Sequence, residues 1–78
     1  MSGFSVNIDG YDIELGHLHE ELRNVVENYP LFPGDTVSHR TAKACARLGW
    51  IKRQGNGYWI PTALGIDEYE RAKYGGAK

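Results

Sequence analysis

Apolar and polar residues alternate on both sides of Asp9-Gly10, near the start of the chain. Asp-Gly between alternating segments is a strong signal for a hairpin with a two-residue type I′ turn. The cross-strand pairs that this turn sets are Ile8 with Tyr11, Val6 with Ile13 and Phe4 with Leu15. These apolar side chains all fall on one face, so residues 4–15 are predicted to form a hairpin that covers a core on one side.

Residues 17–29 follow a helical pattern instead. Their apolar positions have the i, i+4, i+7, i+8, i+11 spacing of one helical face: Leu18, Leu22, Val25, Val26 and Tyr29. The polar positions elsewhere on this helix are Glu20, Glu21, Arg23, Asn24 and Glu27. The pattern predicts an amphipathic helix that ends near Tyr29, because Pro30 disfavours helical geometry in the residue before it.

A second helix is predicted over residues 36–48. Asp35, Thr36 or Ser38 can cap its start, and Gly49 suits the left-handed position just past its end. The residues on one side of this helix are Val37, Thr41, Ala44, Cys45 and Leu48. The residues on the other side are His39, Arg40, Lys43 and Arg47. We therefore expect an apolar face against the core and a basic stripe opposite to it.

Residues 50–61 predict a second hairpin with a glycine-rich tip, Gln54-Gly55-Asn56-Gly57. Either Gly55-Asn56 or Asn56-Gly57 can form the turn. Both alternatives place Ile51 and Ile60 on one face and Lys52 with Trp59 on the other.

The chain then continues into a last helix, predicted over residues 63–74 and capped by Thr62. Pro61, just before it, indicates that the preceding strand lies at the edge of a sheet. Of the two tryptophans beside the hairpin, we expect Trp50 in the core. For Trp59, core packing and stacking on nucleic-acid bases are equally favoured, since its expected face is the outer one.

Acidic and basic residues lie in different parts of the chain, which the formal net charge of -1 does not reveal. Residues 36–61 contain three arginines, two lysines and no acid, whereas residues 1–35 contain seven acids and one arginine. An ordinary exposed helix face mixes both signs. A purely basic stretch on an otherwise acidic protein is typical of a surface for an anionic partner, and nucleic acid is the first candidate.

The length and the cysteine content limit the number of domains and the kinds of site that the chain can form. The 78 residues are enough for one small domain, residues 1–78, with little room for an active-site cleft. Cys45, the one cysteine, has no partner for an internal disulfide. The chain has neither a signal-peptide pattern nor an apolar stretch of roughly 20 residues, so we expect a cytoplasmic protein without membrane contact.

The candidates for enzymatic or metal chemistry are weak. His17 and His19 point about 200° apart on a helix and cannot share one ion there. They can do so only in an extended segment, with His39 or Cys45 as a third ligand. Exposed or capping histidines are the favoured interpretation, and Cys45 on the predicted core face resembles a small buried apolar residue. We expect no metal, no cofactor and no enzymatic activity.

Two short motifs flank the second hairpin: Arg47-Leu48-Gly49-Trp50-Ile51 before it and Pro61-Thr62-Ala63-Leu64-Gly65 after it. Together with the basic hairpin they resemble the recognition helix, wing and following helix of winged helix-turn-helix proteins of the MarR type. The resemblance covers residues 36–72, and Pro61 stands where those proteins commonly have leucine. It implies an α+β fold, a winged helix-turn-helix with an added N-terminal β-hairpin.

The resemblance also implies a function, that of a small transcriptional regulator or accessory factor that binds double-stranded DNA. It makes residues 36–48 the recognition helix and residues 50–61 the wing. The implied DNA-binding residues are His39, Arg40, Lys43 and Arg47 in the helix and Lys52, Arg53, Gln54 and Asn56 in the wing. The family's long terminal dimerisation helices have no counterpart here, so we expect a monomer or a weak homodimer.

A protein-protein interaction module or small inhibitor on the same fold, without DNA binding, is the alternative. The pI near 6.3 and the acidic N-terminal third are unusual for a free-standing DNA-binding protein. In this interpretation the basic face docks on an acidic protein, or the acidic helix 17–29 occupies a basic groove on a partner.

Overall fold

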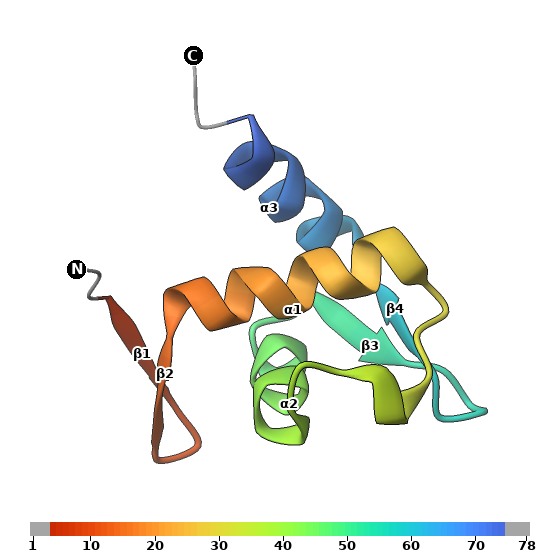
Figure 1. Ribbon diagram of the computed structural model, residues 1–78, viewed down its shortest axis with the longest axis horizontal. Coiled ribbons are helices and arrows are strands. Elements are labelled where there is room, and N and C mark those ends of the chain that lie inside the picture. Colours follow the sequence, from red (N-terminus) through yellow and green to blue (C-terminus); the bar gives the residue numbers. More distant parts are fainter. Residues whose placement is uncertain (1–3, 75–78) are drawn as a thin grey trace.

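The computed structural model describes residues 4–74, which form a small α+β domain (Figure 1). The elements are β1 (Ser5–Ile8), β2 (Tyr11–Glu14), α1 (Leu15–Asn28), the 3₁₀ turn η1 (Pro33–Asp35), α2 (His39–Arg47), β3 (Ile51–Arg53), β4 (Trp59–Pro61) and α3 (Ala63–Lys73). Helix α1 crosses the middle of the molecule, with the β1–β2 hairpin at its start. Below it lies α2, and the β3–β4 hairpin lies beside α2 at the other end (Figure 1).

The N-terminal hairpin has the predicted register. Val6 pairs with Ile13 and Ile8 with Tyr11, and both turn residues have the positive φ of a type I′ turn, 54° at Asp9 and 86° at Gly10. The predicted apolar face, however, is only partly covered. Ile8 and Ile13 are buried, whereas Phe4 is 80% and Tyr11 50% exposed. The hairpin extends beyond the start of α1, so only part of its face has a helix to pack against (Figure 1).

Helix α1 begins two residues earlier than predicted and supplies the centre of the core. Its apolar positions Leu18, Leu22 and Val25 are fully buried, as predicted. Tyr29, expected on the same face, is 58% exposed because it follows the helix in an extended conformation. The buried apolar cluster consists of Ile8, Ile13, Leu18, Leu22, Val25, Leu31, Ala42, Ala44, Cys45, Ile51 and Trp59.

Glu21 is completely buried, although its position in the sequence suggested the polar side of α1. Its carboxylate accepts hydrogen bonds from the backbone N–H of Val37 at 2.9 and 3.0 Å and from that of Ser38 at 3.3 Å. The Asn24 side chain donates a further bond at 3.2 Å. A buried carboxylate is tolerated when such donors replace its water, so Glu21 ties α1 to the segment that leads into α2.

The predicted start of the second helix is wrong, because residues 36–38 are not helical. The backbone of Val37 and Ser38 bonds Glu21 instead. Ser38 is the N-cap, in an extended conformation, and its Oγ accepts a bond from the Thr41 N–H at 3.0 Å. The helix therefore runs over His39–Arg47 rather than over residues 36–48. Val37, expected on the core face, lies before the helix and is 42% exposed.

The second hairpin has a different register from the one predicted. Residues 55–57 form a three-residue loop, in which the Gly57 N–H donates to the Gln54 carbonyl and Gly57 has a φ of 90°. The pairs are Ile51 with Pro61, Lys52 with Ile60 and Arg53 with Trp59. Because the loop has one residue more than the expected turn, Ile51 shares its face with Trp59, and Ile60 lies on the other face with Lys52.

Trp59 is consequently a core residue, only 4% exposed. The Trp59 backbone also exchanges two hydrogen bonds with the Leu31 backbone, of 2.8 and 2.9 Å. They form a single-residue β-bridge along the edge of β4 that does not pair with β3. The bridge attaches the segment after α1 to the hairpin. It ends before Pro61, which has no N–H to offer to a further strand.

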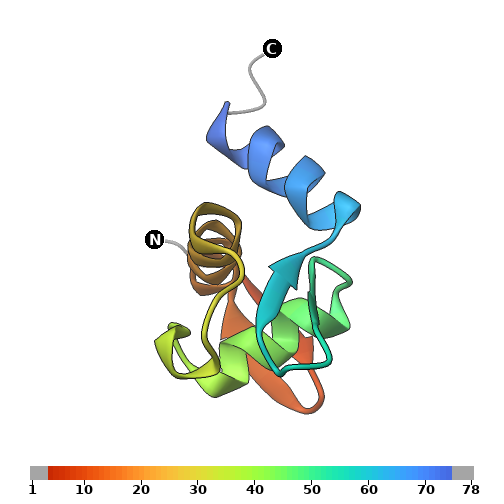
Figure 2. The same ribbon diagram turned by 90° about the vertical axis from the view of Figure 1, so that its right-hand side faces the viewer.

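A tight junction connects the second hairpin to α3. Thr62 caps α3, its Oγ accepting from the Gly65 N–H at 3.0 Å, and the same hydroxyl bonds the carbonyl groups of Gly49 and Trp50. Gly65 lies so close to Trp50 that a Cβ atom there would be 1.9 Å from the Trp50 carbonyl oxygen. From this junction α3 leads away from α2 (Figure 2).

Gly65→Ala is expected to lower the free energy of unfolding by about 2–4 kcal/mol, because the added methyl group overlaps backbone that cannot move aside. Gly16→Ala is the matched control. Gly16 lies in α1 with open space around its Cβ position, so alanine there should stabilise the protein by about 0.5–1 kcal/mol. Urea unfolding followed by circular dichroism measures both. Equal stability of the two variants would contradict the junction as described.

Glu21→Ala is expected to destabilise the fold by roughly 2–3 kcal/mol, since the N–H groups of Val37 and Ser38 lose a charged acceptor. Glu20→Ala removes the same group from an exposed neighbouring position and should change stability by about 0.5 kcal/mol or less. Thermal unfolding of the pair tests this. A Glu21→Ala melting temperature equal to that of Glu20→Ala would show that the buried contact contributes nothing.

Candidate nucleic-acid interface

Helix α2 separates apolar and basic residues as the pattern predicted. Thr41, Ala42, Ala44 and Cys45 are buried. The exposed residues are His39, Arg40, Lys43 and Arg47. Because Ser38 caps the helix and Glu21 holds the preceding segment, this face has a defined orientation relative to the core. The structure thus presents an outward basic face on α2, which we call the α2 basic face and define by those four exposed residues.

The N-terminal hairpin borders the α2 basic face, a contact that sequence reasoning missed. Asp9, at the tip of the hairpin, forms an ion pair with Arg47, with Oδ1 2.8 Å from Nη2. Tyr11 lies under the Arg40 guanidinium, whose central carbon is 4.2 Å from the ring centroid. The only sequence signal for these contacts was the separation of charge, since Asp9 and Arg47 are distant in the chain.

The predicted wing residues divide between two sides of the second hairpin. Arg53 is on the inner side, with its guanidinium carbon 4.9 Å from the centroid of the Trp59 ring and its Nε donating to the Gly57 carbonyl at 3.2 Å. Lys52 is exposed on the outer side with Ile60. Gln54 and Asn56 are exposed at the tip, where the Asn56 side-chain oxygen accepts from the Tyr58 N–H at 3.1 Å.

One surface depression brings residues of both hairpins and α2 together. Its lining comprises Asp9, His39, Lys43, Ala46, Arg47, Arg53 and Trp59. A second depression lies between α2 and the N-terminal hairpin, and Arg40 and Lys43 contribute to it. The structure therefore gathers His39, Lys43, Arg47 and Arg53 at one place. Lys52, Gln54 and Asn56 stay outside it, on the outer side and tip of the hairpin.

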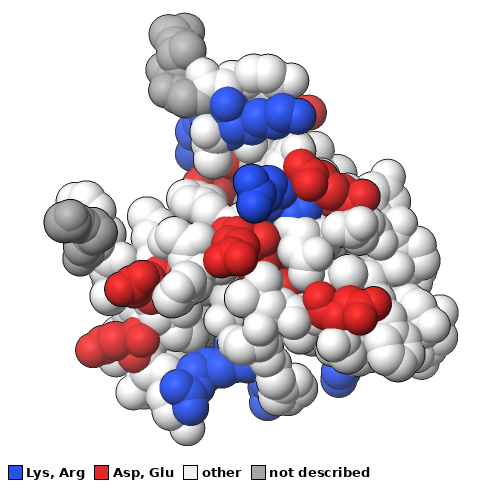
Figure 3. Space-filling view, in the orientation of Figure 1, with Lys and Arg blue, Asp and Glu red and all other residues white. Residues whose placement is uncertain are grey.

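Charge is distributed unevenly over the surface. In Figure 3, acidic side chains spread over the N-terminal hairpin and α1, and basic side chains gather along the lower edge, where Figure 1 places α2. A further basic group lies on α3, where Arg71 is paired with Asp67 at 2.9 Å and Glu68 at 3.2 Å. Within residues 4–74, no ion pair or side-chain hydrogen bond involves Lys43 or Lys52. These two lysines are thus available for an anionic partner.

The histidines of α1 have separate surroundings. His17 is exposed, with Nε2 3.7 Å from Glu14. His19 stacks on Trp50 with ring centroids 5.3 Å apart and bonds Glu68 at 2.9 Å. Across residues 4–74, the His, Cys, Asp and Glu side chains form no group of three that would hold a metal ion. Trp50, expected in the core, is only partly buried and packs against the edge of the buried cluster, with His19 against its ring.

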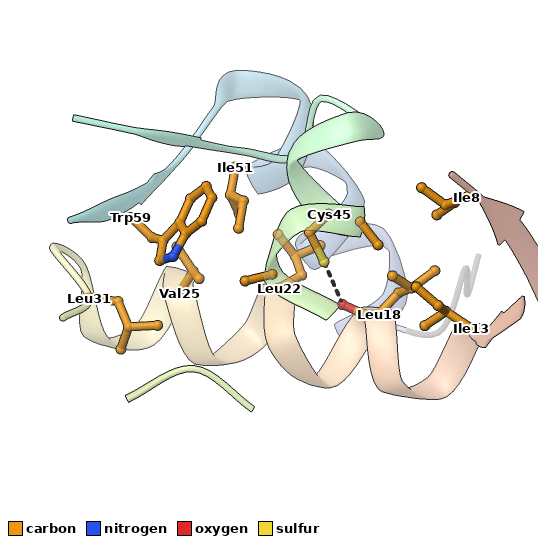
Figure 4. Close-up of a cluster of buried hydrophobic side chains, with 11 residues drawn as sticks. Ile8, Ile13, Leu18, Leu22, Val25, Leu31, Cys45, Ile51 and Trp59 are labelled. Carbon is orange, nitrogen blue, oxygen red and sulfur yellow. Dashed lines mark hydrogen bonds between the residues drawn. The ribbon is translucent and has the colours of Figure 1, made fainter. Parts of the chain in front are cut away.

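Cys45 is fully buried, and its Sγ donates to the Leu18 carbonyl at 3.3 Å (Figure 4). Burial and, to a smaller extent, the nearby Glu21 charge raise the pKa of the Cys45 thiol to about 12. The thiolate, which is the nucleophilic form, is therefore absent near neutral pH. This fits the expected role of Cys45 as a small apolar core residue.

Comparison with known proteins yields no relative: no family model matches the chain, and no curated protein or solved structure matches it. None of the helices within residues 4–74 is long and apolar enough to cross a membrane. A functional proposal thus depends on the geometry and charge of the chain itself.

The Cys45 thiol should resist a thiol reagent in the native protein at pH 8 and react quickly after unfolding. Since its pKa is higher in the folded state, its contribution to stability is complete below the unfolded pKa of about 9 and decreases as pH rises toward about 12. Unfolding at pH 8 and 10.5 measures the loss. Cys45→Ala should lose less stability over this interval, and an equal loss would contradict the burial effect.

Proposed function

We propose that this protein is a winged-helix protein without enzymatic activity that binds double-stranded DNA, as a small transcriptional regulator or an accessory factor. The observation that carries the proposal is the shared depression, in which Arg53 of the second hairpin joins His39, Lys43 and Arg47 of α2. The succession of α2, the β3–β4 hairpin and α3 corresponds to the recognition helix, wing and following helix of that family. The short turn η1 occupies the place before the recognition helix.

The dimensions of α2 suit this role. An α-helix with its side chains is about 10–12 Å in diameter, which fits the major groove of about 12 Å width, and the nine residues of α2 give it an axial length of about 13 Å. Lys43, near the middle of the exposed face, would reach base edges or phosphates. Lys52 on the outer side of the hairpin would hold a phosphate, and Gln54 and Asn56 would supply neutral donors.

The motifs behind the family resemblance have a structural explanation that supports the same proposal. Thr62, Gly65 and Gly49 join the hairpin, α3 and the end of α2 through one set of close contacts. These contacts set the angle between α2 and the hairpin, which a protein with a wing must hold constant to engage a groove and its flanking phosphates together.

A protein-protein interaction module without DNA binding is the second candidate. It is favoured by the acidic residues of α1 and by a depression between α1 and α3, whose lining contains Glu20 and Glu27 together with Arg23 and Lys73. In that case a basic partner would occupy the α1 side, or an acidic partner the α2 basic face. Duplex affinity would then be weak and vanish near physiological salt.

Titration with a random-sequence duplex at several salt concentrations tests the DNA proposal. Binding should weaken with salt, and Lys52→Ala should reduce the slope of log K against log salt by about 0.9, the contribution of one phosphate. Lys43→Ala should weaken binding about 5- to 30-fold, the range expected for about 1–2 kcal/mol from a lost charged contact.

Arg23→Ala, which removes an exposed cation on α1, is the matched control and should leave affinity nearly unchanged. Two results would count against the DNA proposal. One is the absence of binding at low salt, and the other is an equal loss of affinity in Arg23→Ala and Lys43→Ala.

A further inference from the structure

Asp9 places a carboxylate directly on the α2 basic face. Its Oδ1 is 2.8 Å from Arg47 Nη2, and it lines the same depression as His39, Lys43 and Arg53. A carboxylate and a phosphate are alternative partners for one guanidinium, because both offer two oxygens to its paired N–H groups. Asp9 thus stands where a phosphate oxygen would stand if Arg47 bound DNA.

The position of Asp9 is built into the fold. The turn residues have φ values of 54° at Asp9 and 86° at Gly10, and the paired strands fix the tip of the hairpin. Ile8 and Ile13 anchor the hairpin in the core. The carboxylate is therefore held beside α2 by packing that does not involve Arg47.

The ion pair itself is exposed, with the Arg47 side chain 67% and the Asp9 side chain 46% accessible to solvent. Pairs of this kind are weak, so a well-placed phosphate can displace the carboxylate. Binding of DNA without regard to sequence depends almost entirely on phosphate contacts. A weak internal competitor at one of these contacts would reduce such binding.

Building on the proposed function, we propose that Asp9 is a specificity-determining residue that occupies Arg47 and thereby limits sequence-independent binding to duplex DNA. Tyr11 acts alongside it, since its ring lies 4.2 Å from the Arg40 guanidinium carbon and restrains that side chain without neutralising it. The added N-terminal hairpin then has a function, which is to make binding depend more on base contacts from the centre of α2.

Asp9→Asn tests this while preserving the turn. Asn-Gly is a favoured type I′ pair, and asparagine tolerates a positive φ. Asp12→Asn is the matched control, because it removes the same charge from the same hairpin at a residue that bonds Asn7. Asp9→Asn should bind a random-sequence duplex about 3- to 10-fold more tightly at low salt and steepen the slope of log K against log salt by about 0.9. Asp12→Asn should change affinity less and leave the slope unchanged.

Arg47→Gln provides the second arm, since the gain from Asp9→Asn should disappear in the Asp9→Asn/Arg47→Gln double variant. Inorganic polyphosphate serves as a probe that has phosphates but no bases, and Asp9→Asn should bind it more tightly too. Asp9→Gly, which also fits the turn, replaces Asp9→Asn if thermal unfolding shows that the asparagine variant is not folded.

The outcomes separate the two proposals. Equal duplex binding by Asp9→Asn and Asp12→Asn, or a gain that persists without Arg47, overturns the role of Asp9 and leaves the DNA proposal standing. Tighter polyphosphate binding by Asp9→Asn, with no duplex binding by any variant at low salt, supports the competition at Arg47 and overturns DNA as the partner. No binding of either probe by any variant overturns both.

Discussion

The buried carboxylate of Glu21 is the interaction on which the arrangement of the helices depends. It joins α1, which supplies the centre of the core, to the N–H groups of Val37 and Ser38 just before α2. A buried charge is costly unless hydrogen bonds compensate it, and these donors do so only in one relative placement of the two helices. This placement determines where α2 begins and which of its faces meets the core.

With α2 held in this way, its basic face has to point outward. Cys45, on its inner side, bonds the Leu18 carbonyl, and the two hairpins lie on either side of its outer face. The second hairpin brings Arg53 toward α2, and the first brings Asp9. The proposed DNA-binding face is therefore a composite of three elements, in which favourable and opposing charges are set side by side.

Much of this fold was predictable because local rules act within short segments. The register of the first hairpin follows from Asp9-Gly10 alone, and the helical spacing identified the buried side of α1 and the exposed side of α2. The second hairpin was predicted, but its register was wrong because Gly55-Asn56-Gly57 allows either a two-residue turn or a three-residue loop. That single residue reverses the faces and moves Trp59 into the core.

The sequence by itself determined the order and type of the elements, the basic face of α2 and the small, apolar character of Cys45, because each depends on residues close together in the chain. Only the tertiary structure decided the burial of Glu21 and the pairing of Asp9 with Arg47. Both are contacts between charged groups far apart in sequence, and a charged residue in a local pattern is expected at the surface, without a partner. Such contacts arise from how helices and hairpins pack against one another, and periodicity within a single element carries no information about that packing.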